Sequence, residues 1–142
     1  MLCAVDEAKK AALKGEIPVG AVIIKDNKII ARGHNRREER MNPLSHAETE
    51  AINEACRALG SWRLDGCTMY VTLEPCPMCA GAILNSRISE VYFGAYDEKY
   101  GSFGSAMKLH EAEGFSAPRV IGGYMQNTCE NILKEFFEKL RK

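Results

Sequence analysis

The sequence predicts an α/β domain whose central sheet is mixed and is covered by helices on both faces. Segments typical of buried strands alternate along the chain with segments typical of amphipathic helices, an order that favours parallel pairing. The exception is a pair of consecutive strand-like segments near the N-terminus, joined by Asp26 and Asn27. Two such segments around a short polar turn predict a hairpin, which adds an antiparallel pair to the sheet.

Four segments have the apolar spacing of helices. The first has alanines at helical intervals among lysines and acids and ends at Gly15. In the second, Ser45 is the expected N-cap, Glu48 stands at the capping-box spacing, and Gly60 ends the helix. The predicted helices span residues 2–14, 47–59, 76–85 and 127–142.

Five β-branched or apolar runs are typical of strands, and they span residues 19–24, 28–31, 67–73, 91–95 and 119–125. Residues 96–105 contain several glycines and serines and predict a loop of functional length. No repeat or linker divides the chain, so we expect residues 1–142 to form one domain, which is long enough to bury a single core.

Net charge, hydropathy and cysteine content indicate which partners and which cellular compartment to expect. The formal net charge is zero, which argues against broad affinity for a polyanion but allows a specific nucleic-acid substrate. The sequence has neither an apolar run that could span a bilayer nor the pattern of a secretory signal, so we expect a cytoplasmic protein without a membrane partner. In a reducing compartment, cysteines outside a metal site are expected to be small core residues, here Cys3, Cys56, Cys67 and Cys129.

Two short motifs predict a metal centre. His46-Ala47-Glu48 begins one predicted helix, and the segment Pro75-Cys76-Pro77-Met78-Cys79 begins another. Cysteines three residues apart share a helical face, so both sulfurs can reach one ion. Zinc takes thiolate and imidazole ligands in a tetrahedron, and three protein ligands leave the fourth position open, as a catalytic site requires.

Glu48 is the expected proton carrier of this site. Residues two apart on a regular helix point in nearly opposite directions, so His46 must stand at the helix entrance for both to face the metal. A zinc-bound water has a lowered pKa, and a nearby carboxylate can take its proton and later deliver it to a ring nitrogen and to departing ammonia. The combined motifs are the signature of zinc deaminases. A structural zinc site, buried thiols, or a purely capping Glu48 are the alternatives.

At these residues the chain resembles the cytidine deaminase superfamily and, more closely, the bacterial tRNA-specific adenosine deaminases. The metal motifs are shared by the whole superfamily, whereas residues 93–105 resemble the tRNA branch in particular. The first helix begins about one turn later than in that family. The resemblance extends over nearly the whole chain, and the segments that carry it are residues 15–22, 33–36, 42–48, 70–83, 86–88 and 93–105.

The resemblance implies a three-layer α/β/α sandwich with a mixed, roughly five-stranded central sheet, the cytidine deaminase-like fold. It also implies a homodimer with one Zn²⁺ per subunit. The implied activity is the hydrolytic deamination of adenosine to inosine at the wobble position of a tRNA anticodon stem-loop. Two other functions stay open: deamination of a free base or nucleoside such as guanine, cytosine or cytidine, and a catalytically silent zinc scaffold.

The resemblance also implies residues that meet the substrate. Val19 and Asn35 would line the base pocket, while Asp97 and Lys99 would touch the anticodon loop. From the residues alone, Asn35 could be a turn residue and the two loop charges could be solvated.

Three residues near the C-terminus have two interpretations. By resemblance, Phe136, Phe137 and Arg141 would help to bind RNA. The spacing of the two phenylalanines also fits a helix packed on the core, which is the interpretation that we expect.

Overall fold

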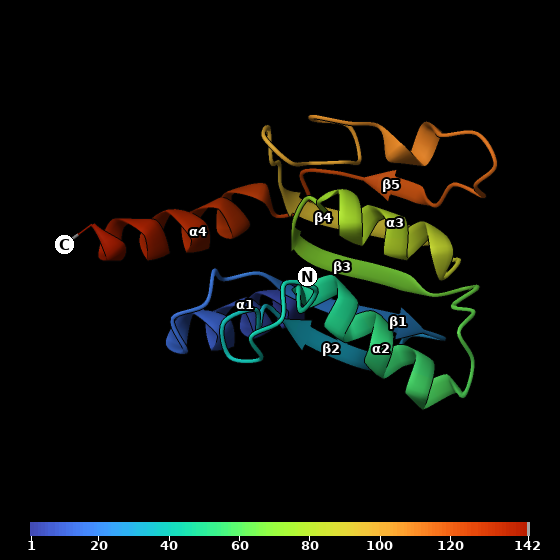
Figure 1. Ribbon diagram of the computed structural model, residues 1–142, viewed down its shortest axis with the longest axis horizontal. Coiled ribbons are helices and arrows are strands. Elements are labelled where there is room, and N and C mark those ends of the chain that lie inside the picture. The colour runs from blue at the N-terminus through green and yellow to red at the C-terminus, as the bar shows by residue number, and fades with distance from the viewer. Residues whose placement is uncertain (142) are drawn as a thin grey trace.

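A five-stranded mixed sheet forms the middle layer of the molecule in the computed structural model, which describes residues 1–141 (Figure 1). The strands lie in the order β2-β1-β3-β4-β5. Strand β1 is antiparallel to both β2 and β3, whereas β3, β4 and β5 run parallel. The strands are β1 (Gly20–Lys25), β2 (Lys28–His34), β3 (Thr68–Leu73), β4 (Glu90–Ala95) and β5 (Arg119–Ile121).

Helices cover both faces of this sheet, which confirms the predicted three-layer fold. On one face lie α2 (Ala47–Leu59) and α3 (Pro77–Asn85), and on the other lie α1 (Leu2–Leu13) and the start of α4 (Gln126–Leu140). The remainder of α4 extends away from the sheet (Figure 1). A short 3₁₀ turn, η1 (Leu109–Glu111), was not predicted. No helix within residues 1–141 combines the length and the apolar character needed to cross a membrane.

The main core lies between the sheet and the α2/α3 layer, because the alternate residues of β1, β3 and β4 that face these helices are apolar. The sheet contributes Ala21, Ile23, Met69, Val71, Val91 and Phe93, and the helices contribute mainly alanines and Ile83. Small residues let the helices approach closely, so the first turns of α2 and α3 come side by side at one end of the sheet.

The N-terminal hairpin forms as predicted. Asp26 and Asn27 both have positive φ, 50° and 63°, as a two-residue turn of type I′ requires, and short polar side chains tolerate this conformation. Strand β2 nevertheless continues to His34 instead of ending at residue 31, because it pairs with β1 along its whole length.

The C-terminal elements differ from their predicted bounds. Strand β5 ends at Ile121 rather than at residue 125, because Gly123 and Met125 take left-handed backbone conformations with φ of 76° and 54°. Helix α4 ends at Leu140, and Lys142, which the predicted helix included, lies outside the described residues.

The prediction that the phenylalanines of α4 belong to the core is wrong. Cys129 is the buried residue of this helix within the described chain, whereas Phe136 is half-buried and Phe137 is 40% exposed. The helix has extended beyond the sheet at this point, so the sheet does not cover these rings (Figure 1). They pack edge to face on each other instead, with centroids 5.4 Å apart. Of the four cysteines expected in the core, Cys67 and Cys129 are buried and the other two are half-buried.

Candidate active site

His46 stands at the entrance of α2, as its pairing with Glu48 requires. Its backbone is extended, with φ −83° and ψ 162°, and it is the N-cap of the helix. The prediction of Ser45 as N-cap and Glu48 as its capping-box partner is therefore wrong by one residue. Thr49 occupies that position instead, and its hydroxyl oxygen accepts the backbone N–H of His46 at 3.1 Å. Glu48 is thus not engaged in capping.

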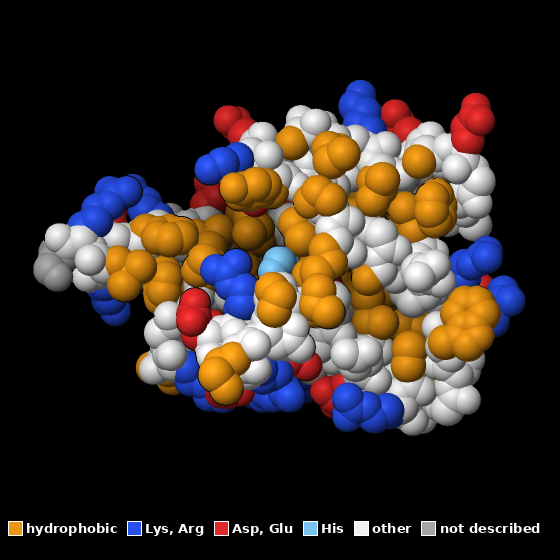
Figure 2. Space-filling view, in the orientation of Figure 1, with side chains coloured by type: hydrophobic (Ala, Val, Ile, Leu, Met, Phe, Trp, Pro, Cys, Tyr) orange, Lys and Arg blue, Asp and Glu red, His pale blue; other side chains and the backbone are white. Residues whose placement is uncertain are grey.

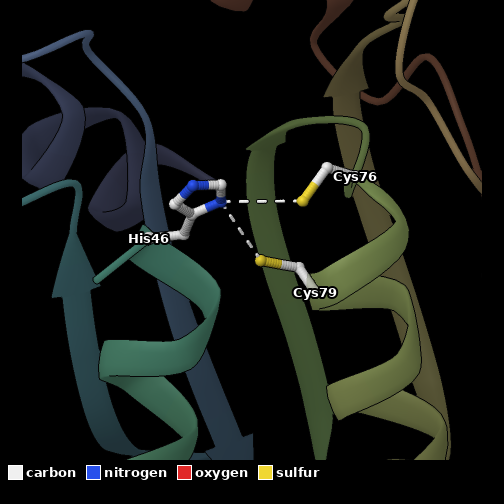
Figure 3. Close-up of side chains that lie close together, drawn as sticks. All are labelled: His46, Cys76 and Cys79. Atoms are coloured by element: carbon white, nitrogen blue, oxygen red, sulfur yellow. Dashed lines mark hydrogen bonds between the residues drawn. The ribbon is translucent and has the colours of Figure 1, made fainter. Parts of the chain in front are cut away.

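The two cysteines stand at the start of α3 in a similar arrangement. Cys76 is the N-cap with extended backbone, Pro77 follows at the first helical position, and Cys79 lies in the first turn. Both sulfurs point toward the imidazole of His46 from the neighbouring helix (Figure 3). The distances from His46 Nδ1 to Sγ of Cys76 and of Cys79 are 3.6 Å and 3.5 Å.

This trio fits a zinc ion. A tetrahedral zinc with ordinary Zn–N and Zn–S bonds places the nitrogen and each sulfur about 3.6 Å apart, which matches the two observed distances. All three ligand atoms lie within 4.8 Å of one another, and within residues 1–141 no fourth protein ligand joins them. Three protein ligands indicate a catalytic rather than a structural metal site.

Hydrogen bonds within the trio shift the pKa values of its members. A hydrogen bond from the Cys79 thiol is the largest influence on Cys76 and lowers the pKa of Cys76 to about 4, while the same contact raises the pKa of Cys79. The hydrogen bond to Cys76 raises the pKa of His46, against the opposite effect of burial. One thiolate is therefore already favoured at neutral pH, and thiolates are the form that binds zinc.

Glu48 is buried beside this trio, with 4% of its surface exposed. Burial disfavours the charged carboxylate and raises the pKa of Glu48 to about 7. A carboxyl group with a pKa near neutrality can both accept and donate a proton under physiological conditions. The residue therefore has the properties that a general acid and base needs.

A pocket of about 210 Å³ opens next to the trio. Three of the four predicted substrate-binding residues line it, namely Val19, Asn35 and Asp97. The fourth, Lys99, is not among the lining residues, and its ammonium group lies 5.2 Å from the centre of the Tyr100 ring. The full lining is Ile17, Val19, Asn35, Arg37, His46, Ala47, Glu48, Leu73, Glu74, Cys76, Asp97 and Tyr100.

The two polar residues of the pocket also organise their own loops. Asn35 donates to the carbonyl of Ile17 at 3.3 Å and accepts the backbone N–H of Arg37 at 3.2 Å, so it acts as a turn residue as well. Asp97 accepts the backbone N–H groups of Lys99 and Tyr100 with one oxygen, each at 3.1 Å. The second oxygen of Asp97 makes none of these bonds.

Sequence reasoning missed two buried carboxylates that hold the loops at the pocket. Glu16 accepts the backbone N–H groups of Glu38 and Glu39, at 3.1 Å and 2.8 Å, and so fixes the turn after Asn35. Glu74 plays a similar part on the opposite side of the pocket. The available signal in both cases was an acidic residue inside an otherwise apolar segment, close to a proline. Glu74 directly precedes a proline, and one residue separates Glu16 from the next proline.

Comparison with known proteins gives consistent matches. The MafB19-like deaminase family matches residues 1–141. The tRNA-specific adenosine deaminase of Bacillus subtilis (strain 168) is 51% identical over 98% of this chain and 87% of the relative. That of Aquifex aeolicus (strain VF5) is 45% identical over 97% of this chain and 91% of the relative.

Solved structures of other deaminases also match this chain. A structure from studies of A-to-I editing by tRNA:A34 deaminases at the wobble position of transfer RNA has a TM-score of 0.91 and 41% identity, and the match covers 94% of this chain and 97% of that one. A guanine deaminase from Bacillus subtilis has a TM-score of 0.63 and 45% identity, with 66% and 60% covered. The chain therefore belongs to the MafB19-like deaminase family and, within it, to the tRNA-specific adenosine deaminases.

Proposed function

We propose that the protein is a zinc-dependent hydrolase that converts adenosine to inosine at the wobble position of a tRNA anticodon. The observation that carries this proposal is the trio of His46, Cys76 and Cys79, which could hold a metal ion, with Glu48 buried beside it at the wall of a pocket. The choice of a tRNA substrate is supported by the relatives named as tRNA-specific adenosine deaminases, which match nearly the whole chain.

The chemistry follows from the residues around the pocket. His46, Cys76 and Cys79 would hold the zinc, which would supply the Lewis acidity that lowers the pKa of a water at the site toward neutrality. Glu48 accepts the proton that the water loses and delivers it to the ring nitrogen next to C6 of adenine. The oxygen of the water becomes bonded to C6, and the bond from C6 to the exocyclic nitrogen breaks. Glu48 then takes the remaining proton from the hydroxyl group formed at C6 and delivers it to the departing nitrogen, which leaves as ammonia. C6 becomes a carbonyl, and the base that remains is hypoxanthine.

The pocket walls suit a base that has left the stack of an RNA loop. Unstacked loop bases are read on their polar edges and packed against side chains. We propose that Val19 packs on the base, that Asn35 hydrogen-bonds to it, and that Asp97 meets the nucleotide at the rim. Lys99 lies outside the pocket on the exposed part of the same loop, and we assign it to the phosphates of the anticodon loop.

A second copy of the chain is the proposed partner of the face that carries α2 and α3. Hydrophobic side chains spread across this face (Figure 2), and Leu44 beside the start of α2 is 58% exposed. A groove of about 280 Å³ runs next to it. The groove is lined by Asn42, Leu44, Ser45, Thr49, Glu50, Ile52, Asn53 and Ala82. Leu44→Glu is expected to shift the protein from dimer to monomer in light scattering, and an unchanged mass would contradict this interface.

We place the enzyme in the cytoplasm with its tRNA substrate.

A substrate comparison tests the proposed activity. The zinc-loaded protein is incubated with an unmodified tRNA carrying adenosine at position 34, with the same tRNA carrying guanosine there, and with free adenosine, cytidine and guanine. We expect inosine and ammonia from the first tRNA alone. Deamination of a free base or nucleoside with the tRNA unchanged would instead favour the small-molecule enzyme. No product from any substrate, with zinc bound, would favour the silent scaffold.

A further inference from the structure

One wall of the pocket is a loop, residues 96–105, that follows β4. Asp97 and Tyr100 from this loop line the pocket, and residues 101–103 are buried, with Phe103 in the main core. Most of the remaining residues face solvent. A solvent-facing segment without regular structure needs a specific anchor to keep one conformation. Glu74 directly follows the neighbouring strand β3, is only 1% exposed and borders the same pocket.

The carboxylate of Glu74 is bonded to this loop through both of its oxygens. Oε1 accepts the backbone N–H of Asp97 at 3.2 Å and the hydroxyl of Ser105 at 2.5 Å. Oε2 accepts the backbone N–H groups of Phe103 and Ser105, each at 3.1 Å. All four donors come from the loop, so one side chain ties together its beginning and its end.

No cation shares this work in the described part of the chain, where the ion pairs of lysine, arginine and histidine involve other carboxylates. Hydrogen bonds to a charged acceptor are stronger than neutral ones, and four of them replace the water that burial removed. The negative charge of Glu74 is therefore balanced by the loop itself, and the loop cannot leave without exposing a buried charge.

Gly101 shows how closely the loop wraps around the carboxylate. A Cβ at this position would lie 2.3 Å from Cδ and 2.4 Å from Oε1 of Glu74, and 2.3 Å from the carbonyl oxygen of Asp97. Any side chain at residue 101 would therefore push the loop off its anchor. The absence of a side chain here and the buried carboxylate are two independent parts of one arrangement.

We infer that Glu74 is a positioning residue that holds loop 96–105 as a wall of the substrate pocket, and that it serves substrate binding rather than proton transfer. The inference rests on the proposed function for the identity of the substrate. Asp97 and Tyr100 are the groups that it positions, since both border the pocket and lie in the anchored loop.

The test begins with Glu74→Gln in the zinc-loaded protein. The amide keeps the shape of the side chain but replaces an acceptor by an N–H₂ donor, which faces donors of the loop. Hydrogen–deuterium exchange is expected to become faster at the amides of Asp97, Phe103 and Ser105, while zinc content stays at the wild-type level. With an anticodon stem-loop substrate, we expect KM to rise on the order of 10- to 100-fold, because the binding wall is misplaced, and kcat to change far less.

Matched variants separate anchoring from general damage. Gly101→Ala attacks the same contact from the loop side and is expected to give the same exchange pattern and the same rise in KM. Gly81→Ala is its control in the exchange measurement, because a Cβ at that helical position meets nothing within 4 Å. Glu98→Gln is the control for charge, since Glu98 belongs to the same loop but is exposed. Both controls should leave the protection of the loop amides unchanged.

The outcomes are distinct for the inference and for the proposed function. Unchanged exchange in both Glu74→Gln and Gly101→Ala would overturn the anchoring role, whatever the substrate is. A fall in kcat with unchanged KM would overturn the assignment to binding and would indicate that Glu74 acts through the metal ligand Cys76. Inactivity of the wild-type protein on the tRNA would count against the proposed function alone, and the exchange result would still decide whether Glu74 anchors the loop.

Discussion

Replacing Gly33 by alanine tests how the sheet holds the metal site in place. Gly33 lies in β2 directly under α2, where a Cβ would be 2.4 Å from the carbonyl oxygen of Ala47 and 2.7 Å from the backbone nitrogen of Ala51. These are backbone atoms of the helix and cannot rotate away. The first turn of that helix carries both His46 and Glu48.

The size of the effect follows from these distances. Ordinary van der Waals contacts begin at 3.4 Å, so α2 must move outward by about 1 Å at its first turn. Overpacking of this kind costs about 1–3 kcal/mol of unfolding free energy. The same movement pulls the imidazole of His46 away from two sulfurs that sit at zinc-binding distance, and we expect zinc affinity to fall on the order of 10- to 100-fold.

Two assays and one control variant make the prediction specific. Stability is measured by denaturant unfolding of the chelator-treated proteins, so that bound metal does not contribute to it. Zinc affinity is measured separately by competition with a chromophoric chelator. Gly20→Ala is the control, because its Cβ would be 2.0 Å from the carbonyl oxygen of Ala4 in α1, on the opposite face of the sheet. It should lose stability but keep its zinc affinity.

Two results would contradict the expected effect of Gly33→Ala. If Gly33→Ala binds zinc as tightly as the wild type, then the position of α2 on β2 does not set the geometry of the site. If Gly20→Ala loses zinc affinity to the same extent, then the loss in either variant reflects general destabilisation.

Two further predictions concern stability. Burial raises the pKa of Glu7, but hydrogen bonds from a neighbouring lysine and from His34 at 3.0 Å outweigh it, so the pKa of Glu7 is lowered from its ordinary 4.5. The contribution of the Glu7 carboxylate to stability is therefore fully present above pH 4.5 and is lost as the pH falls through the lowered pKa. Glu7→Gln should lower the unfolding free energy by about 1–3 kcal/mol at pH 7 and by less at pH 3. An equal difference at both pH values would contradict this expectation. Phe93→Ala, at a 1% exposed core position, should lower the unfolding free energy by about 3–5 kcal/mol. Phe137→Ser in α4 should change it by no more than about 0.5 kcal/mol. Comparable losses in the two variants of the monomeric protein would show that α4 packs more tightly than described.

Much of the fold could be predicted because local signals and long-range packing agree. The hairpin turn at Asp26 and Asn27 needs positive φ at both positions, and the residue types there tolerate it. The grouping of His46, Cys76 and Cys79 could be predicted because their spacing within each helix start fixes which side chains share a face. Their meeting in space then follows from two helices lying side by side on one face of the sheet.

The predictions failed where two local patterns compete or where the partner is distant in sequence. Ser45 with Glu48 and His46 with Thr49 have the same capping spacing, and only the path of the chain into α2 selects the second pair. Glu74 could not be recognised as an anchor, because its donors are 23 to 31 residues further along the chain.

The position of the α4 phenylalanines outside the core escaped prediction for a related reason. A helical apolar stripe indicates that one face is covered, but it does not say by what. In the structure the helix extends beyond the sheet that would have covered it (Figure 1).

The role of Glu48 in deamination is tested by comparing inosine formation at position 34 of a tRNA by the wild-type protein and by Glu48→Gln, each at a measured zinc content. The glutamine preserves the buried shape of the side chain but cannot accept a proton. We expect the variant to hold one zinc per chain and to form inosine on the order of 100- to 10,000-fold more slowly. A variant that keeps its zinc and deaminates the tRNA at the wild-type rate would contradict the role of Glu48 as the group that moves protons in this site.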